Sequence, residues 1–344
     1  MMSLLRLLGA SSLLALAAAG LGCAHGTVPT VDDGEDVDDG TRFAVGAGPS
    51  AGLAAALGRV GAAPDGGAAP TEVGPAAWSD GPACSDATQY VYVLSAEGEI
   101  HRFWPPTLTF ERVGRPSCLP EGAAMFSMAV DRHARAFALA QDQIVYQVDL
   151  ATGACEPTAV DRSTAGLAFR HFGMAYVADP TSPDGETLFV REAWVGTSTW
   201  GFGGAPDPGT RRLATLDPRT GRLALRGTGE GVDADLTGTG DGKLYGFFVS
   251  GEVGQIDVAT GALATRFDLG GLQVEGGWAV AAWGGDLWVF SSVLGETTRA
   301  HRFHPSTGQI DLVSDQAGFE VVGAGVSTCA PTAASEPEPV EPPS

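Results

Sequence analysis

Short apolar runs separated by tight polar turns recur along most of the chain. Four of these runs close in a shared turn, at Thr152-Gly153, Thr220-Gly221, Thr260-Gly261 and Thr307-Gly308. Copies of one unit at regular spacing indicate a repeat fold, because each copy is too small to bury its own apolar face. Glycine suits such turns since it adopts positive φ without steric cost. The pattern therefore predicts a series of small β-sheets.

An aromatic residue marks the second strand of each unit and recurs at intervals of 43 to 56 residues, which is the spacing of β-propeller blades. The five aromatic residues are Tyr92, Phe137, Phe189, Tyr245 and Trp288. The first, inner strands are expected at 125–131, 173–179, 233–239, 278–283 and 319–328. Third strands are expected at 99–103, 144–148, 212–216, 254–256 and 299–303, with an outer fourth strand as at 263–267.

The two ends of the repeat region complement each other. The first unit begins at Tyr90 without a first strand, whereas the chain ends in a first strand at 319–328. If these pair, the ring closes and no sheet edge is left open, which is how propellers protect their backbone. The inner strands are also rich in Gly and Ala, as a narrow ring requires. We therefore predict an all-β, five-bladed β-propeller over residues 84–330.

Composition separates this region from the segments that flank it. Residues 23–83 and 331–344 are rich in Ala, Gly, Pro and acidic residues, so they bury too little apolar surface to order, and we expect a disordered tether and a disordered tail. The net charge of −21, with only 20 Lys and Arg, argues against nucleic acid as a partner.

Two motifs in the tether suggest ligands but lack the context they need. The acidic stretch from Asp32 to Asp39 does not have the alternating ligand spacing of a calcium loop. The G-x-G-x-x-A sequence at 46–51 lacks the strand and helix of a dinucleotide-binding unit. We expect no cofactor and no metal.

The N-terminus has the anatomy of a signal peptide over residues 1–22, with Arg6 followed by an apolar run at 7–19. It ends in Gly20-Leu21-Gly22-Cys23, which resembles the lipobox of bacterial lipoproteins, although Gly20 stands where that family usually has Leu. The resemblance implies cleavage before Cys23, lipidation of its thiol, and a membrane anchor in the cell envelope. Ala24 is not the acidic residue that retains some such proteins on the inner membrane, so we expect the outer membrane. Plain secretion is the alternative.

Export changes how the other four cysteines are interpreted. Cys84, Cys118, Cys155 and Cys329 form an even set in an oxidising compartment, which favours two disulfides with three possible pairings. A zinc site is the competing interpretation, but no C-x-x-C pair exists. Ring closure would bring Cys84 and Cys329 together, which leaves Cys118 with Cys155.

The repeated phrase of strand, Thr-Gly turn and strand resembles the broad propeller superfamily that contains the PQQ-binding and YVTN-type repeats. The resemblance covers about 240 residues but lies only in the spacing of strands and turns, and those families have more blades. It implies a fold and no functional residue.

Two functions remain open at this stage. The favoured one is a non-enzymatic, lipid-anchored module that binds or scaffolds an envelope protein or carbohydrate. Its candidate contact residues are Trp200 and Phe202 in a long loop, together with Trp278 and Trp283. The alternative is a glycoside hydrolase, which needs two carboxylates about 5 to 9.5 Å apart. Asp131, Asp179 and Asp235 are the candidates.

A tripeptide repeats in the third strands of two neighbouring blades. The copies are His101-Arg102-Phe103 and His301-Arg302-Phe303. Equivalent register places the two histidines one blade apart and not at one point, so we expect surface or packing roles rather than a metal site.

Overall fold

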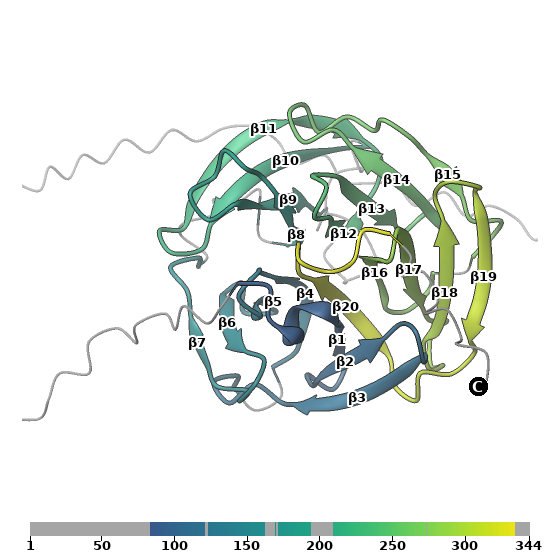
Figure 1. The fold of residues 1–344 in the computed structure, drawn as a ribbon, viewed down its shortest axis with the longest axis horizontal. Coiled ribbons are helices and arrows are strands. Elements are labelled where there is room, and N and C mark those ends of the chain that lie inside the picture. The colour runs from purple at the N-terminus through teal and green to yellow at the C-terminus, as the bar shows by residue number, and fades with distance from the viewer. Residues whose placement is uncertain are drawn as a thin grey trace, which may run out of the picture. The chain divides into compact units, whose positions relative to one another are not determined.

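The computed structural model describes residues 83–120, 123–161, 169, 171–193, 209–272 and 274–333. The chain divides into two units, 1–72 and 73–344, and all of the described residues belong to the second. These residues form five four-stranded antiparallel sheets, preceded by one short 3-10 helix, η1 at Asp86–Gln89. Figure 1 shows the sheets as the blades of a ring, with β4, β8, β12, β16 and β20 around its middle. The prediction of an all-β, five-bladed propeller is confirmed.

Each blade has four strands, which follow one another from the middle of the ring to its rim. Blade 1 consists of β20 (Val321–Val326), β1 (Val91–Ser95), β2 (Ile100–Trp104) and β3 (Thr109–Gly114). Blade 2 consists of β4 (Met125–Val130), β5 (Arg135–Ala140), β6 (Val145–Asp149) and β7 (Cys155–Pro157). Blade 3 consists of β8 (Phe172–Ala178), β9 (Glu186–Glu192), β10 (Thr210–Asp217) and β11 (Arg222–Glu230). Blade 4 consists of β12 (Ala234–Gly238), β13 (Leu244–Phe248), β14 (Glu252–Ile256) and β15 (Phe267–Asp268). Blade 5 consists of β16 (Trp278–Trp283), β17 (Asp286–Ser291), β18 (Arg299–His304) and β19 (Gln309–Ser314).

The last strand completes the first blade, as the sequence predicts. β20 pairs antiparallel with β1, with Val91 opposite Val326 and Leu94 opposite Gly323. Because β1 is sandwiched between β2 and β20, neither of its edges is left without a partner. The ring is therefore closed by residues more than two hundred positions apart in the chain.

The turns between third and fourth strands show why the Thr-Gly phrase repeats. In blade 2 the Asp149 carboxylate accepts hydrogen bonds from the backbone N–H groups of Ala151 and Thr152, at 2.8 and 3.0 Å. Gly153 then turns the chain with φ of +72°, a conformation that other residues rarely adopt. Blade 1 places Leu108 at the corresponding turn with φ of +57°.

Glycines allow the inner strands to approach closely. A Cβ on Gly173, at the start of β8, would collide with the carbonyl oxygen of Ala234, at the start of β12. A Cβ on Gly238, at the end of β12, would collide with the carbonyl oxygen of Tyr176 near the end of β8. Starts therefore lie beside starts and ends beside ends, so neighbouring inner strands run in the same direction around the axis.

The hydrophobic core lies between neighbouring blades rather than at one centre. Phe103 of blade 1 packs edge-on against Trp288 and Phe290 of blade 5, with ring centroids 5.3 and 5.7 Å apart. Four similar clusters fill the other junctions. Each blade is thus stabilised through its two neighbours.

One outer strand is shorter than expected. The sequence predicts a fourth strand of blade 4 at 263–267, whereas β15 contains only Phe267 and Asp268, with a single bridge between Ile256 and Leu263. The Thr265 hydroxyl accepts a hydrogen bond from Gln255 N at 3.2 Å, in place of a backbone carbonyl. This side-chain bond interrupts the ladder between the two segments.

Candidate functional site

The chain crosses one end of the ring after β20. We call residues 327–333 the strap. The end of the ring at which the inner strands finish is called the strap end, and the end at which they begin is called the opposite end. In Figure 1 the yellow segment after β20 lies over the middle of the ring. The strap therefore covers the strap end of the central opening. Three of the predicted site residues, Asp131, Asp179 and Trp283, lie at this end.

The strap is held by several blades. Thr328 Oγ1 donates to Glu186 Oε2 of blade 3 at 2.6 Å. Gly284 N of blade 5 donates to Pro331 O at 2.7 Å. Gly240 of blade 4 lies so close to Thr328 O that a Cβ there would collide with it. These contacts fix the strap across the mouth rather than at its rim.

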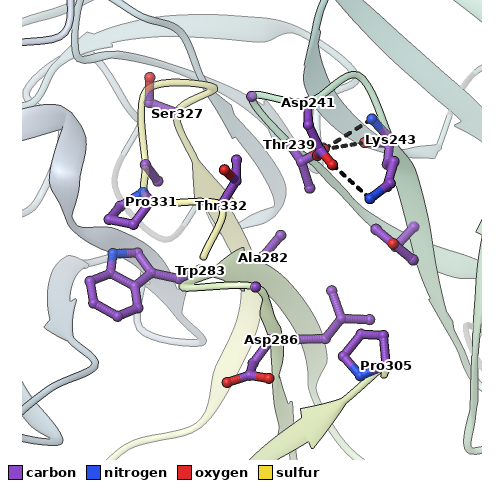
Figure 2. Close-up of a pocket in the computed structure, with 16 residues that line it drawn as sticks. Thr239, Asp241, Lys243, Ala282, Trp283, Asp286, Pro305, Ser327, Pro331 and Thr332 are labelled. Carbon is purple, nitrogen blue, oxygen red and sulfur yellow. Dashed lines mark hydrogen bonds and ion pairs between the residues drawn. The ribbon is translucent and has the colours of Figure 1, made fainter. Parts of the chain in front are cut away.

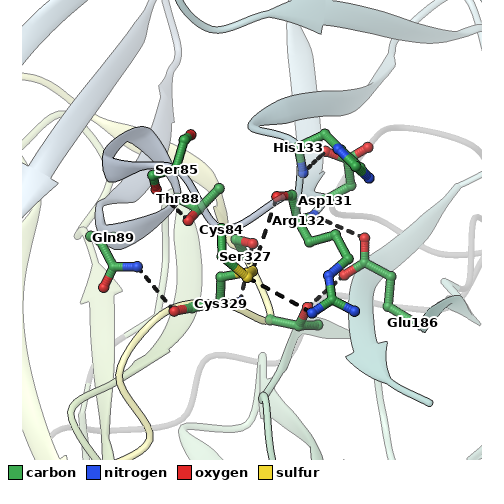
Figure 3. The surroundings of a disulfide bond; sticks show 11 residues. Cys84, Ser85, Thr88, Gln89, Asp131, Arg132, His133, Glu186, Ser327 and Cys329 are labelled. Carbon is green, nitrogen blue, oxygen red and sulfur yellow. Dashed lines mark hydrogen bonds between the residues drawn. A yellow bond between two sulfur atoms is a disulfide. The ribbon is translucent and has the colours of Figure 1, made fainter. Parts of the chain in front are cut away.

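A disulfide ties the strap to the start of the first blade. Cys84 and Cys329 are bonded, with Cα atoms 5.2 Å apart and a sequence separation of 245 residues. Figure 3 shows the surroundings: Cys84 N donates to Arg132 O at 2.8 Å, and Gln89 Nε2 donates to Cys329 O at 3.1 Å. The bond therefore joins blade 1, the strap and the β4–β5 turn.

The second disulfide lies within the outer part of the ring. Cys118 and Cys155 are bonded with Cα atoms 5.3 Å apart and a separation of 37 residues. Cys155 opens β7, so the bond connects the exit of blade 1 to the outer strand of blade 2. Both disulfides have the pairing that ring closure predicts.

Glu186 is the most unusual carboxyl at the strap end, and sequence reasoning missed it. Glu186 is the first residue of β9 and is 5% exposed. Besides Thr328, it accepts a hydrogen bond from Arg132 N at 2.8 Å. Burial raises the pKa of Glu186 to about 7, against the lowering effect of these two hydrogen bonds. The signal is invisible in the sequence because the strap that buries Glu186 is 142 residues away.

Two of the three candidate catalytic carboxylates are committed to turns at the strap end. Asp131 follows β4 and forms an ion pair with Arg135, from carboxylate Oδ2 to Nε, at 2.6 Å. Asp179 follows β8 and accepts from Thr181 N at 2.9 Å and from Thr187 Oγ1 at 2.9 Å. Hydrogen bonds from Thr181 lower the pKa of Asp179. Their oxygens therefore stabilise local backbone, a common role for Asp after a strand.

The third candidate, Asp235, lies elsewhere. It is the second residue of β12, near the opposite end, and its Oδ2 accepts from Val280 N of β16 at 3.0 Å. Within the described residues its Oδ1 has no hydrogen-bond partner. Burial raises the pKa of Asp235 well above its ordinary value. Thr237, two residues on, accepts from Ala282 N at 2.8 Å. These two side chains join β12 to β16, and the structure does not gather the three carboxylates at one point.

The two candidate tryptophans of β16 lie at its two ends. Trp283, at the strap end, is 8% exposed, donates from Nε1 to Gln89 O at 2.7 Å and packs edge-on against Trp104. It belongs to the core between blades 5 and 1. Trp278, at the opposite end, is partly buried between blades 4 and 5. The two rings do not form a joint surface.

A small cleft at the strap end separates blades 4 and 5. Figure 2 shows Thr239, Asp241 and Lys243 on one side, and Trp283 and Thr332 on the other. Its volume is about 60 Å³, which is room for about two water molecules. Lys243 Nζ and Asp241 Oδ2 pair at 2.6 Å, so the charges of this turn neutralise each other.

A polar cluster borders the same cleft on blade 5. Asp286, 8% exposed, accepts from Arg302 Nε at 2.6 Å and pairs with His304 Nδ1 at 2.8 Å. His304 Nε2 lies 3.2 Å from Asp311 Oδ2. This chain of side chains joins β17, β18 and β19 across the blade, and it stabilises the blade rather than facing a substrate-sized cavity.

Two buried arginines at the opposite end also escaped sequence reasoning. Arg191 and Arg211 are each 1% exposed. Arg211 pairs with Asp233 at 2.6 Å, whereas Arg191 donates to Val232 O at 2.7 Å and stacks over Phe248. Burial, and then the nearby Arg211, lower the pKa of Arg191 to about 10. Their burial depends on Val232, Asp233 and Phe248, which come from later in the chain.

Several predictions fall outside the described residues. They concern the signal peptide at 1–22, lipidation of Cys23, the tether up to residue 82, Trp200, Phe202 and the tail at 334–344. Among the residues that the structure does describe, no three His, Cys, Asp or Glu side chains gather closely enough to hold a metal ion. In the same part of the chain, no helix has the length and apolar character needed to cross a membrane.

No protein-family model matches the chain, and no curated protein matches it. Among solved structures it is similar to TolB from Acinetobacter baumannii, with a TM-score of 0.39, 16% identity, and coverage of 67% of this chain and 54% of that one. It is also similar to a protein of unknown function from Bacteroides caccae, with a TM-score of 0.40, 12% identity, and coverage of 68% and 84%. The match thus spans about half of the TolB chain, and similarity at this level carries no argument about function.

Proposed function

We propose that this protein is an exported, lipid-anchored propeller of the cell envelope that works as a binding or scaffolding module. The observation that carries the proposal is the sealed strap end: a segment of the chain's own occupies that mouth and is fixed by a disulfide. A ring closed in this way presents its other surfaces rigidly, and rigidity lowers the entropic cost of binding. Two disulfides also fit a protein that folds in an oxidising compartment.

The partner surface is proposed at the opposite end. The long connection of blade 3 begins after Glu192, at the end of β9, and ends at Thr210, at the start of β10. Both attachment points belong to the opposite end, where Trp278 also begins β16. Trp200 and Phe202 of this connection remain the proposed contact residues, because aromatic side chains are effective anchors in interfaces.

The proposed contacts are tested by comparing two variants in their capture of envelope material. Trp200→Ala together with Phe202→Ala should abolish capture of the bound protein or carbohydrate from detergent-solubilised envelope, with an unchanged melting temperature. Lys243→Ala, at the rim of the strap end, is the matched control and should capture normally. Equal capture by both variants, or loss of capture only with Lys243→Ala, would contradict a contact surface at the opposite end.

The anchor is tested separately. Cys23→Ala should abolish incorporation of radiolabelled palmitate and release the protein from the membrane fraction, since the thiol is the attachment point that the lipobox resemblance implies. Separation of inner and outer membranes should place the unsubstituted protein in the outer membrane. Labelling that survives in Cys23→Ala would exclude this attachment site without affecting the binding proposal.

The carboxylates of the glycosidase alternative have other roles in the fold. Such an enzyme needs an acid and a second carboxylate on either side of an accessible glycosidic bond. Asp131 and Asp179 hold turns, and Asp235 is buried on another part of the inner strands. No specific contact in the described residues favours that reaction over binding.

A further inference from the structure

A groove lies at the opposite end, between blades 4 and 5. Its volume is about 230 Å³, which liquid water would fill with about eight molecules. The lining residues are Gly271, Leu272, Ser291, Ser292, Val293, Arg299 and His301. Glycine and leucine come from the connection between blades 4 and 5, and the rest come from β17, β18 and the loop between them.

Two buried polar atoms beside this groove lack partners. His301 Nδ1 and Trp278 Nε1 are both inaccessible to solvent, and neither has a hydrogen-bond partner within the described residues. The strand register places them together, because Trp278 lies opposite Ser291, and Ser291 lies opposite Arg299, two residues from His301. Side chains two apart on a strand share a face. Trp278, Ser291, Arg299 and His301 therefore share the face of blade 5 that looks toward blade 4.

A buried polar group without a hydrogen-bond partner destabilises the fold, so two of them on one face indicate that a partner is missing. The indole N–H can only donate, and the Arg299 guanidinium can only donate. Burial, and then Arg299, lower the pKa of His301, so its ring is neutral at neutral pH and carries one N–H. The face thus offers several donors and a single positive charge.

The charge at the rim is available to a ligand. Arg299 Nη2 pairs with Glu296 Oε2 at 2.9 Å, but both side chains are about half exposed. Exposed pairs of this kind contribute little to stability, so Arg299 exchanges partners at low cost. Ser292, by contrast, already donates to Glu320 Oε1 at 3.0 Å and is not free to take part.

The neighbouring junction shows what a filled version of this groove looks like. His101 has the same place in blade 1, since it lies opposite Val93 as His301 lies opposite Val289. There the ring of Phe319 stacks on the imidazole with centroids 4.0 Å apart. Glu99, in the position that corresponds to Arg299, pairs with Arg112. The junction between blades 5 and 1 is thus closed by an aromatic ring and bordered by an acid.

We propose that the groove between blades 4 and 5 binds a small organic carboxylate, with Arg299 pairing to the carboxylate, His301, Ser291 and Trp278 donating hydrogen bonds, and Leu272 and Val293 covering the apolar part. One cation matches one carboxylate, and a guanidinium fits its two oxygens in a fork. The inference concerns a site of its own. It does not rest on the lipid anchor or on the macromolecule that the ring binds.

The test uses the full purified chain and follows the indole N–H signal of Trp278 by NMR, assigned with Trp278→Phe. Acetate, propionate and succinate are the carboxylate probes, acetamide is their uncharged counterpart, and inorganic phosphate is an anion of another shape. We expect at least one carboxylate to shift the signal saturably and acetamide to leave it in place. A response to acetamide or to phosphate alone, or no response to any carboxylate, would overturn the proposal.

Variants separate this site from general effects of charge. Arg299→Gln should weaken the carboxylate by about tenfold or more because it removes the positive charge that pairs with it, and His301→Leu should do so because leucine cannot donate a hydrogen bond. His101→Leu, in the filled junction, is the matched control and should bind as the unsubstituted protein does. Leu272→Phe should block binding by occupying the groove, with an unchanged melting temperature as the sign of intact folding. Unaltered binding in both Arg299→Gln and Leu272→Phe would exclude this groove.

Discussion

The two ends of the ring are built in opposite ways. At the strap end, segments far apart in the chain meet: the strap, the β4–β5 turn and the start of β9 converge on the Cys84–Cys329 disulfide and on Glu186. At the opposite end, contacts such as those of Arg191 with Val232 and of Ser292 with Glu320 join neighbouring blades without a covalent link, and a groove of about 230 Å³ lies between blades 4 and 5. The same five-fold repeat therefore has one end that is fixed by its own chain and one end that holds unpaired donors.

This difference follows from how a propeller closes. The chain must return to its starting blade, so both termini of the ring meet at one end, and that end becomes the natural place for a covalent link. The opposite end carries the connections between blades and the turns between second and third strands, and these are free to vary in length and side chains. We infer that closure and recognition are divided between the two ends.

The largest expected effect comes from removing the ring-closing disulfide. Cys84→Ala together with Cys329→Ala should lower the free energy of unfolding by about 5 kcal/mol, because a link across so long a loop strongly restricts the unfolded chain. The melting temperature should fall by roughly 10–20 °C for a domain of this size. Hydrogen exchange should rise first in β20 and β1, the paired strands of blade 1.

The control for this prediction is the shorter disulfide. Cys118→Ala with Cys155→Ala should cost about 4 kcal/mol, since its loop is shorter, and should leave exchange in β20 unchanged. If removal of the long-range disulfide neither lowers the melting temperature nor opens β20, the strand pairing alone closes the ring and the strap end is not the fixed one.

The second prediction concerns Glu186. Burial raises its pKa to about 7 from an ordinary value of 4.5, so the folded protein holds this proton more tightly than the unfolded chain does. The stabilising contribution is complete below pH 4.5 and is lost as pH rises through about 7. The loss amounts to about 3 kcal/mol. Chemical denaturation across this range measures it.

Glu186→Gln isolates that contribution from the other titrating groups. Glutamine can still accept from Arg132 N and donate to Thr328 Oγ1, but it does not ionise. The difference in unfolding free energy between the two proteins should therefore change with pH between 4.5 and 7. Parallel profiles for the two proteins would mean that Glu186 is not buried by the strap in solution.

Much of the fold follows from local sequence. The Thr-Gly turns are readable because each needs an acceptor such as Asp149 and a glycine such as Gly153, and both signals lie within five residues. Ring closure is readable because an unmatched first strand at one end of the chain complements a missing one at the other. The short length of β15 could not be predicted from the sequence. The hydrogen bond from Gln255 N to the Thr265 hydroxyl replaces a backbone bond between β14 and β15, and β propensity does not reveal such a replacement.

The candidate site is less readable because it depends on distant segments. Glu186 is an ordinary acidic residue at a strand start until the strap covers it. His101 and His301 sit in identical tripeptides, yet one is stacked by Phe319 and the other borders a groove. Trp283, a candidate contact residue, lies in the core because Trp104 and Gln89 close over it. A repeated motif fixes strand register, whereas the connections between blades determine what each register position meets.

The third prediction compares two changes at Asp235. Burial raises the pKa of Asp235 well above its ordinary value, so a neutral side chain suits this place, and Asp235→Asn, which keeps an oxygen that accepts from Val280 N, should leave stability nearly unchanged. Asp235→Ala removes the acceptor of Val280 N and should cost about 1–3 kcal/mol. Denaturation midpoints at pH 7 measure both. Equal losses in the two variants would show that the inner strands are held by more than this one acceptor.

The smallest expected effect is at the outer rim of the strap end. Leu108 adopts φ of +57° in the β2–β3 turn, where the related turns of other blades have glycine. A residue with a Cβ is disfavoured in this conformation. Leu108→Gly should therefore raise the free energy of unfolding by about 0.5–1 kcal/mol, because the relief of strain outweighs the added freedom of the unfolded chain. Gly153→Ala, in the equivalent turn of blade 2, should lower it by a similar amount. A loss of stability in Leu108→Gly would mean that the leucine side chain contributes more through packing than its backbone conformation costs, and blade 1 would then close its turn by contacts where the other blades rely on glycine.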